Sequence, residues 1–211
     1  MKKIIFILAT MLAVFASDVS FAQSLSKKDL KNIEKDAKKE AKSLKEKGWL
    51  ASPGAMTIER QLEKAYAMSY EKSEDGEDLY VMGNGQSVGK TYDAAKRQAL
   101  EMAKQEVVSK IQSEIATLVE TSVDNEQLDS EEAESITRVV AEGTSFSKIN
   151  LGRVITVTEL YRDIKGTKNK EVLIRVGYNY NAAMRAAKAV IREDLEKRGE
   201  KVRDKLNNLL K

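Results

Sequence analysis

The sequence predicts an α+β fold, in which a long helix packs on a small, mainly antiparallel three-stranded sheet, with helical extensions at both ends. Apolar residues recur at every fourth position from Ala95 to Ile115, which is typical of a helix with one buried side. A glycine-rich segment precedes that helix, and two segments rich in Val, Ile and Thr follow it. The single proline, Pro53, is consistent with long uninterrupted helices.

The glycine-rich strand and the long helix are predicted to pack closely together. The strand is expected from Leu79 to Val88, with Gly83 and Gly85 inside it and Gly89 after it, and the helix over residues 91–120. Glycine in a strand often marks the close approach of another backbone. The alanines of the helix lie in its N-terminal half, nearest to these glycines, so small side chains are expected to meet there.

The last two strands are predicted to form an antiparallel hairpin. They cover residues 151–164 and 171–180, and a turn at residues 166–169 separates them. Alternate positions from Val172 to Tyr180 are apolar or aromatic, which predicts a strand with one dry face.

Further helices are predicted outside the sheet. The apolar spacing from Ile58 to Ser69 indicates a short helix, and Ser130 begins another. Asn181 is expected to cap a final helix over residues 182–210.

The N-terminal segment, residues 25–47, is predicted to be a thin amphipathic helix. It carries a narrow stripe of six apolar residues among nine lysines and five acids. Two interpretations fit this pattern: a solvated helix with one apolar seam on the domain, or a basic helix lying on an anionic membrane surface. The first is favoured, because no aromatic residue occurs before Trp49 and the helix is expected to end at Gly48.

The first 22 residues have the pattern of a cleavable secretory signal peptide. Two lysines precede an apolar run at residues 4–16, and the small residues Ser20 and Ala22 occupy the expected cleavage positions. A transmembrane helix needs roughly 20 apolar residues, so this run is too short to be favoured as an anchor. Cleavage after Ala22 would leave Gln23 first. Because the chain has no cysteine to acylate, we expect a periplasmic or secreted protein without a lipid anchor.

The composition argues against several kinds of chemistry. Without histidine and cysteine, the commonest general base, the commonest zinc ligand and thiol nucleophiles are missing. Without residues 1–22 the chain has 34 basic and 32 acidic residues, a net charge of +2, so no nucleic-acid surface is expected. The stretch Gly83–Thr91 fails the spacing of a phosphate-binding loop, and the acidic segment at residues 124–132 fails that of a calcium loop. We therefore predict no catalytic residues, no cofactor and no metal site.

Several short motifs occur in an order that is known from one family. They are Val81–Gly85, Tyr92–Ala99, Ile111–Glu114, Gly152–Val154 and Glu171–Val176. Over about residues 79–181 the chain resembles the LPP-type lipoprotein domain, which also occurs at the N-terminus of the flagellar assembly protein FlgT. The segments Phe21–Gln23 and Leu44–Trp49 resemble a family of secreted proteins from Bacteroidota. The resemblance implies an envelope-associated, non-catalytic domain with a helix on a small antiparallel sheet. The chain lacks the acylated cysteine and further flagellar domains, so neither anchoring nor a flagellar role carries over.

The predicted organisation has four parts: a signal peptide at residues 1–22, a charged amphipathic helix at 23–50, an α+β domain at 57–181 and a C-terminal helix at 182–211. The expected function is that of a non-enzymatic structural or partner-binding protein of the cell envelope, with a protein partner or self-association. The alternatives are a peripheral membrane-surface binder using the lysine-rich helix, and a histidine-free hydrolase using carboxylates. No transmembrane segment is expected after signal cleavage. The residues expected to contact a partner are Trp49, Val202, Leu206 and Leu209.

Overall fold

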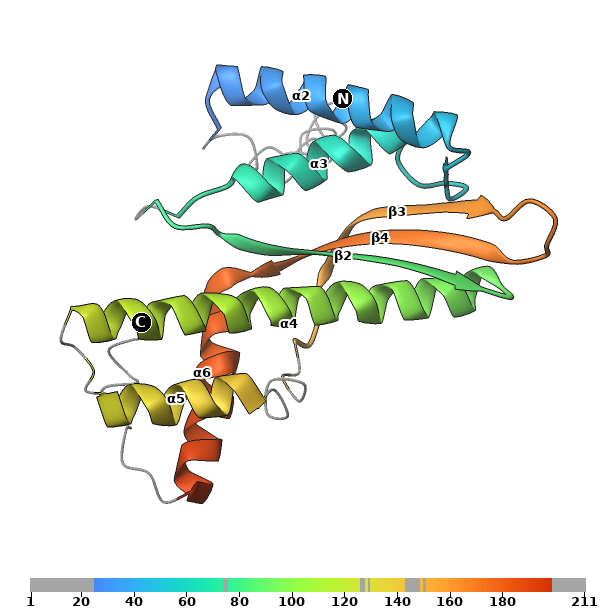
Figure 1. Ribbon diagram of the computed structural model, residues 1–211. Coiled ribbons are helices and arrows are strands. Elements are labelled where there is room, and N and C mark those ends of the chain that lie inside the picture. Colours follow the sequence, from blue (N-terminus) through green and yellow to red (C-terminus); the bar gives the residue numbers. More distant parts are fainter. Residues whose placement is uncertain are drawn as a thin grey trace, which may run out of the picture.

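The computed structural model describes residues 25–73, 76–125, 128, 130–142, 149 and 151–198. It has the predicted α+β fold, in which helices cover both faces of an antiparallel sheet. From the top of Figure 1 the layers are α2 with α3, the sheet, α4 and then α5, and α6 runs downward from the sheet past α4 and α5. In chain order the elements are α2 (Lys27–Glu46), β1 (Leu50–Ala51), α3 (Ile58–Tyr70), β2 (Tyr80–Gly89), α4 (Tyr92–Asp124), α5 (Ser130–Glu142), β3 (Ile155–Asp163), β4 (Lys170–Asn179) and α6 (Tyr180–Arg198).

The described sheet has the strand order β1-β3-β4-β2, with every neighbouring pair antiparallel. β3 and β4 form the predicted hairpin, and β2 pairs with β4 along its whole length. The additional strand β1 lies at the far edge, where Leu50 is opposite Tyr161. The sequence predicts three strands and not this fourth one, because a two-residue segment is too short to show an alternating pattern.

The glycines of β2 bring this strand against the backbone of α4, as predicted. A Cβ atom added at Gly85 would lie 1.8 Å from the carbonyl oxygen of Ala99, and one added at Gly83 would lie 2.1 Å from that of Ala103. The helix backbone therefore occupies the space that a side chain would need. Ala95, Ala99 and Ala103 are fully buried.

The buried stripe of α4 winds around the helix. Positions four residues apart are offset by about 40°, so the stripe turns by roughly 240° between Ala95 and Val119. Its alanines meet β2, and the same core cluster continues through Ile115 and Val119 and includes Ile136 and Val139 of α5. One helix thus presents small side chains to the sheet in its N-terminal half and branched side chains to the core in its C-terminal half.

The helices α2 and α3 cover the other face of the sheet (Figure 1). Ala37, Ala41 and Leu44 of α2 form an apolar cluster with α3 and β3, in agreement with the favoured interpretation of a seam packed on the domain. The predicted dry face of β4 is confirmed, because Val172, Ile174 and Val176 are buried, but the opposite face is less open than predicted. This second face is partly covered, because Leu173 packs half-buried against the same cluster and the Met68 side chain of α3 lies over Gly177.

The last helix begins two residues earlier than predicted. The side-chain oxygen of Asn179, and not that of Asn181, accepts the hydrogen bond from the backbone N–H of Ala182, at 2.9 Å. The N–H of Tyr180, the first residue of α6, donates to the carbonyl of Leu79 at 2.9 Å. The chain therefore passes from strand to helix without a loop, which places the cap on Asn179. Residues 199–210 of the predicted helix lie outside the described residues.

Candidate functional site

Of the residues predicted to contact a partner, only Trp49 lies in the described part of the chain. Trp49 is 3% exposed and packs in the cluster between α2, α3 and β3. The guanidinium carbon of Arg162 lies 4.7 Å from the centre of its ring. The Trp49 side chain is therefore used inside the protein. The predicted partner residues Val202, Leu206 and Leu209 and the predicted cleavage residues Ala22 and Gln23 lie outside the described residues.

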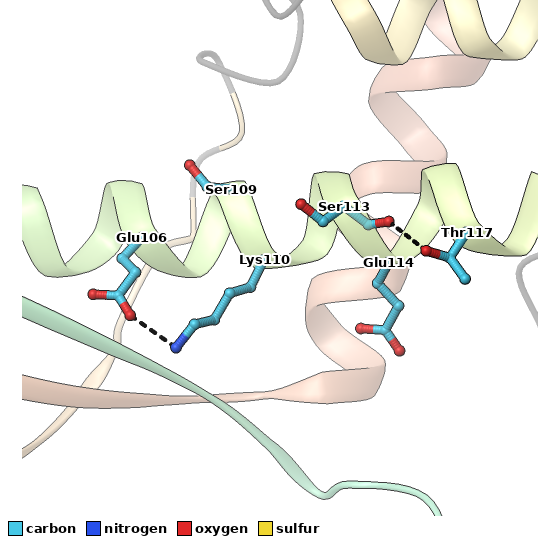
Figure 2. A pocket seen from close by; sticks show the side chains of 6 residues that line it. All are labelled: Glu106, Ser109, Lys110, Ser113, Glu114 and Thr117. Carbon is cyan, nitrogen blue, oxygen red and sulfur yellow. Dashed lines mark hydrogen bonds and ion pairs between the residues drawn. The ribbon is translucent and has the colours of Figure 1, made fainter.

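A shallow, open hollow of about 420 Å³ runs along α4. Its lining residues are Glu106, Ser109, Lys110, Ser113, Glu114 and Thr117 (Figure 2). Glu106, Lys110 and Glu114 are four residues apart and project from the same side of the helix (Figure 2). This group of side chains was not predicted from the sequence, although its spacing is visible there. The contact of these side chains with β2 is not visible in the sequence.

Two charged side chains of the hollow, Glu106 and Lys110, bind the outer edge of β2. Glu106 accepts hydrogen bonds from the backbone N–H of Asn84 at 2.8 Å and from its side-chain amide at 3.1 Å. Lys110 forms an ion pair with Glu106 at 2.8 Å and donates to the backbone carbonyl of Met82 at 2.8 Å. These bonds occupy backbone groups that a further strand would otherwise pair with.

The pKa values of Glu106 and of Tyr180, which contacts Glu114 of the hollow, are shifted away from neutrality. Burial raises the pKa of Glu106, but hydrogen bonds from Lys110 and Asn84 lower it by more, so that it stays below its usual value. Burial, together with a 2.6 Å hydrogen bond donated to Glu114, raises the pKa of the Tyr180 hydroxyl. A general acid or base works best with a pKa near the working pH. Glu106 and Tyr180 are therefore poorly suited to proton transfer near neutral pH, and their hydrogen bonds hold β2 and α6 against α4.

A second polar cluster joins the N-terminal layer to α4. The Tyr92 hydroxyl donates to Glu159, and Lys96 pairs with the same carboxylate at 2.8 Å. Gln61 is 3% exposed, and its side-chain oxygen accepts the backbone N–H of Glu159 at 2.7 Å. Burial and the Glu159 hydrogen bond raise the pKa of Tyr92, and the bond to Glu159 raises that of Lys96. Tyr92 and Lys96 therefore keep their protons at neutral pH and can both donate hydrogen bonds to Glu159.

Glu40 joins α2 to the rest of the molecule. It accepts two hydrogen bonds from Arg175 of β4, one of them at 3.2 Å, and one from the Tyr66 hydroxyl of α3 at 2.7 Å. Burial raises the pKa of Glu40, but the bonds from Arg175 and Tyr66 lower it by more. The carboxylate is therefore ionised and directed inward.

The side of α2 opposite its buried stripe is a row of lysines. At 100° per residue, this side collects five exposed lysines, which we name the lysine face: Lys28, Lys31, Lys35, Lys39 and Lys42. None of the described residues forms an ion pair with them. α2 is the outermost layer of the molecule, on the far side of the sheet from α4 (Figure 1). The face is therefore open to solvent along the helix.

The acids of α2 are mostly directed away from the lysine face. Asp29 closes the N-terminal capping box with Ser26, Glu34 pairs with Lys38, and Glu40 is bound from within. Only Glu46 shares the lysine face, at the C-terminal end of the helix. Nine lysines and five acids give residues 27–47 a net charge of +4. The whole chain carries +3, which leaves −1 for the remainder.

The described residues contain no group of three or more His, Cys, Asp or Glu side chains that could hold a metal ion. No helix in this part of the chain is long and apolar enough to cross a membrane. The glycines of the stretch Gly83–Thr91 are accounted for by the backbone of α4. The resemblance to the LPP-type lipoprotein domain stays a prediction, because no family model, no curated protein and no solved structure matches the chain.

Proposed function

We propose that this protein is exported to the cell envelope and acts there by binding rather than by catalysis, with the lysine face of α2 as its binding surface. The separation of charge on α2 carries the proposal. A helix with eight lysines and five acids would expose a mixed surface if its charges were interspersed, whereas here the carboxylates of Asp29 and Glu40 are held by Ser26 and Arg175. A surface of one sign attracts an oppositely charged partner over a distance.

Two further observations support the proposal. The leader has the composition of a signal peptide, which favours export. The carboxylates that line the hollow on α4 bind Asn84, Lys110 and Tyr180, which favours a structural use over hydrolysis.

The test measures how much of the purified chain sediments with washed envelopes of the producing cells. Wild-type protein should bind at low ionic strength and dissociate as salt is added, because salt screens exposed charges. The variant Lys31→Gln/Lys35→Gln/Lys42→Gln should stay in solution. The control Lys90→Gln/Lys165→Gln/Lys168→Gln removes the same charge from exposed positions elsewhere and should bind like wild type.

A third variant, Glu106→Gln/Glu114→Gln, tests the hollow. We expect it to bind the envelopes like wild type. Retained binding by the α2 variant, or loss of binding in the hollow variant alone, would contradict the assignment of the surface. Urea midpoints of all variants identify any that bind poorly because they are unfolded.

A further inference from the structure

We infer that the lysine face of α2 binds the surface of a lipid bilayer that contains anionic phospholipids, an inference that rests on the proposed binding function. The shape of the face supports this ligand. α2 has 20 residues and is about 30 Å long. Lys31, Lys35 and Lys42 fall within about 40° of one another around the axis, so they form a straight row on the outside of the molecule. A row of this kind contacts a plane of charges, whereas a peptide ligand needs a groove.

The side chains of the face also suit a bilayer better than a protein or a nucleic acid. Residues 25–47 contain no arginine and no aromatic residue. Arginine forks and aromatic rings supply most of the specific recognition of protein partners and of single-stranded nucleic acid. Lysine is a flexible point charge that is depleted at the centres of protein interfaces. Mobile headgroups require charge and reach but no fixed geometry.

The packing of α2 determines how the helix can meet the bilayer. An interfacial helix usually buries its apolar side among the acyl chains. Here Ala37, Ala41 and Leu44 already pack against α3 and the sheet. The contact is therefore electrostatic and stays at the headgroups. Without residues 1–22 the chain carries +2, so the excess of +4 on residues 27–47 over −2 elsewhere turns this side of the molecule toward an anionic surface.

The test is co-sedimentation with vesicles of phosphatidylcholine, with or without phosphatidylglycerol, using chain whose N-terminus has been identified by mass spectrometry. The readout is the difference between the two compositions, which removes any contribution of residues 1–22 that does not depend on lipid charge. We expect binding that requires phosphatidylglycerol and is reversed by salt. Each lysine near an anionic surface contributes about fivefold to affinity, so Lys31→Gln/Lys35→Gln/Lys42→Gln should weaken binding about 100-fold. The control Lys90→Gln/Lys165→Gln/Lys168→Gln should bind within about threefold of wild type, because its lysines lie off the row.

Equal binding to both vesicle compositions, or equal binding by the two triple variants, would overturn the inference. If the chain bound envelopes through the lysine face but ignored phosphatidylglycerol vesicles, the ligand would be an acidic protein or polymer. In that case the inference would fail and the proposed function would stand. Envelopes treated with protease separate these cases further, since binding to lipid survives the treatment.

Discussion

The contact between β2 and α4 makes a sharp prediction for Gly85→Ala. The new Cβ atom would lie 1.8 Å from the carbonyl oxygen of Ala99 and 2.7 Å from the backbone nitrogen of Ala103. The first distance must grow by more than 1 Å to reach the 3.0 Å below which Cβ contacts essentially never occur. Both obstructing atoms belong to a helix backbone and cannot rotate away, so α4 must move as a unit.

The magnitude follows from three contributions. Forcing extra carbon into a packed core costs typically about 1–3 kcal/mol, and a rigid neighbour places this site at the upper end. When α4 moves away, a gap of about 0.5–1 Å opens elsewhere along the contact, and roughly a quarter to a half of the energy of each dispersion contact there is lost. Alanine loses less conformational entropy than glycine when the chain folds, which offsets about 0.5–1 kcal/mol of this cost. We therefore expect Gly85→Ala to lower the free energy of unfolding by about 3 kcal/mol.

Gly177→Ala is the matched control. It lies on β4 of the same sheet, but the atom that its Cβ would meet, at 2.1 Å, is the sulfur of Met68, the flexible end of a side chain. Met68 can adopt another rotamer, so the change should be within about 1 kcal/mol of wild type. Urea unfolding followed by circular dichroism and by Trp49 fluorescence measures both variants. Equal midpoints for Gly85→Ala and Gly177→Ala would refute the idea that the helix backbone limits this contact.

Four more predictions follow from other parts of the molecule. Ala103→Leu should destabilise the protein by about 1–3 kcal/mol in urea, and an unchanged midpoint would mean that the wrong face of α4 has been assigned. Because the pKa of Glu40 is lowered in the folded state, its carboxylate stabilises the fold above its unfolded-state pKa and loses this effect as the pH falls through the folded value. Glu40→Gln should therefore cost about 1–3 kcal/mol at neutral pH and flatten the acid limb of a stability profile; an unaltered limb would contradict this. Burial and the bond to Glu40 raise the pKa of Tyr66 from 10.0 to about 12, so its contribution is complete below the lower value and lost as the pH rises to the upper one. Tyr66→Phe should remove that part of the alkaline destabilisation in urea midpoints, and an identical alkaline limb would count against it. Mass spectrometry of the exported chain should find Gln23 at the N-terminus, and retention of residues 1–22 would disprove the predicted cleavage.

The parts of the fold that could be predicted from the sequence rest on contacts between neighbours in the chain. The glycines of β2 and the alanines of α4 lie in adjacent elements, and the β3–β4 hairpin is closed by a short turn. In both cases the residue pattern itself carries the information. The position of the last cap was mistaken by two residues, because Asn179 and Asn181 are equally good caps and only the pairing of Tyr180 with Leu79 decides between them.

The rest depends on contacts between distant segments. β1 exists only because Leu50 and Ala51 meet β3, and the second face of β4 is partly covered only because α2 and α3 return to it. Of the candidate site, the nine lysines were visible in the sequence, but the inward direction of Glu40 depends on Arg175, 135 residues away. Trp49 illustrates the same limit, since an aromatic residue after a charged helix does not show whether it packs inside the protein or outside.

The close contact between β2 and α4 also bears on the order in which the chain folds. Gly85 meets Ala99, only 14 positions further on, whereas Leu50 must wait for Tyr161 and Glu40 for Arg175. Contacts between near neighbours in sequence form faster than contacts that close long loops. We therefore expect φ-values near one for Ala99 variants and near zero for Glu40 variants in stopped-flow refolding. The N-terminal layer is synthesised first, but its contacts with Tyr161 and Arg175 form last. A chain that crosses a membrane from its N-terminus would therefore remain incompletely folded until residues near 175 had also crossed.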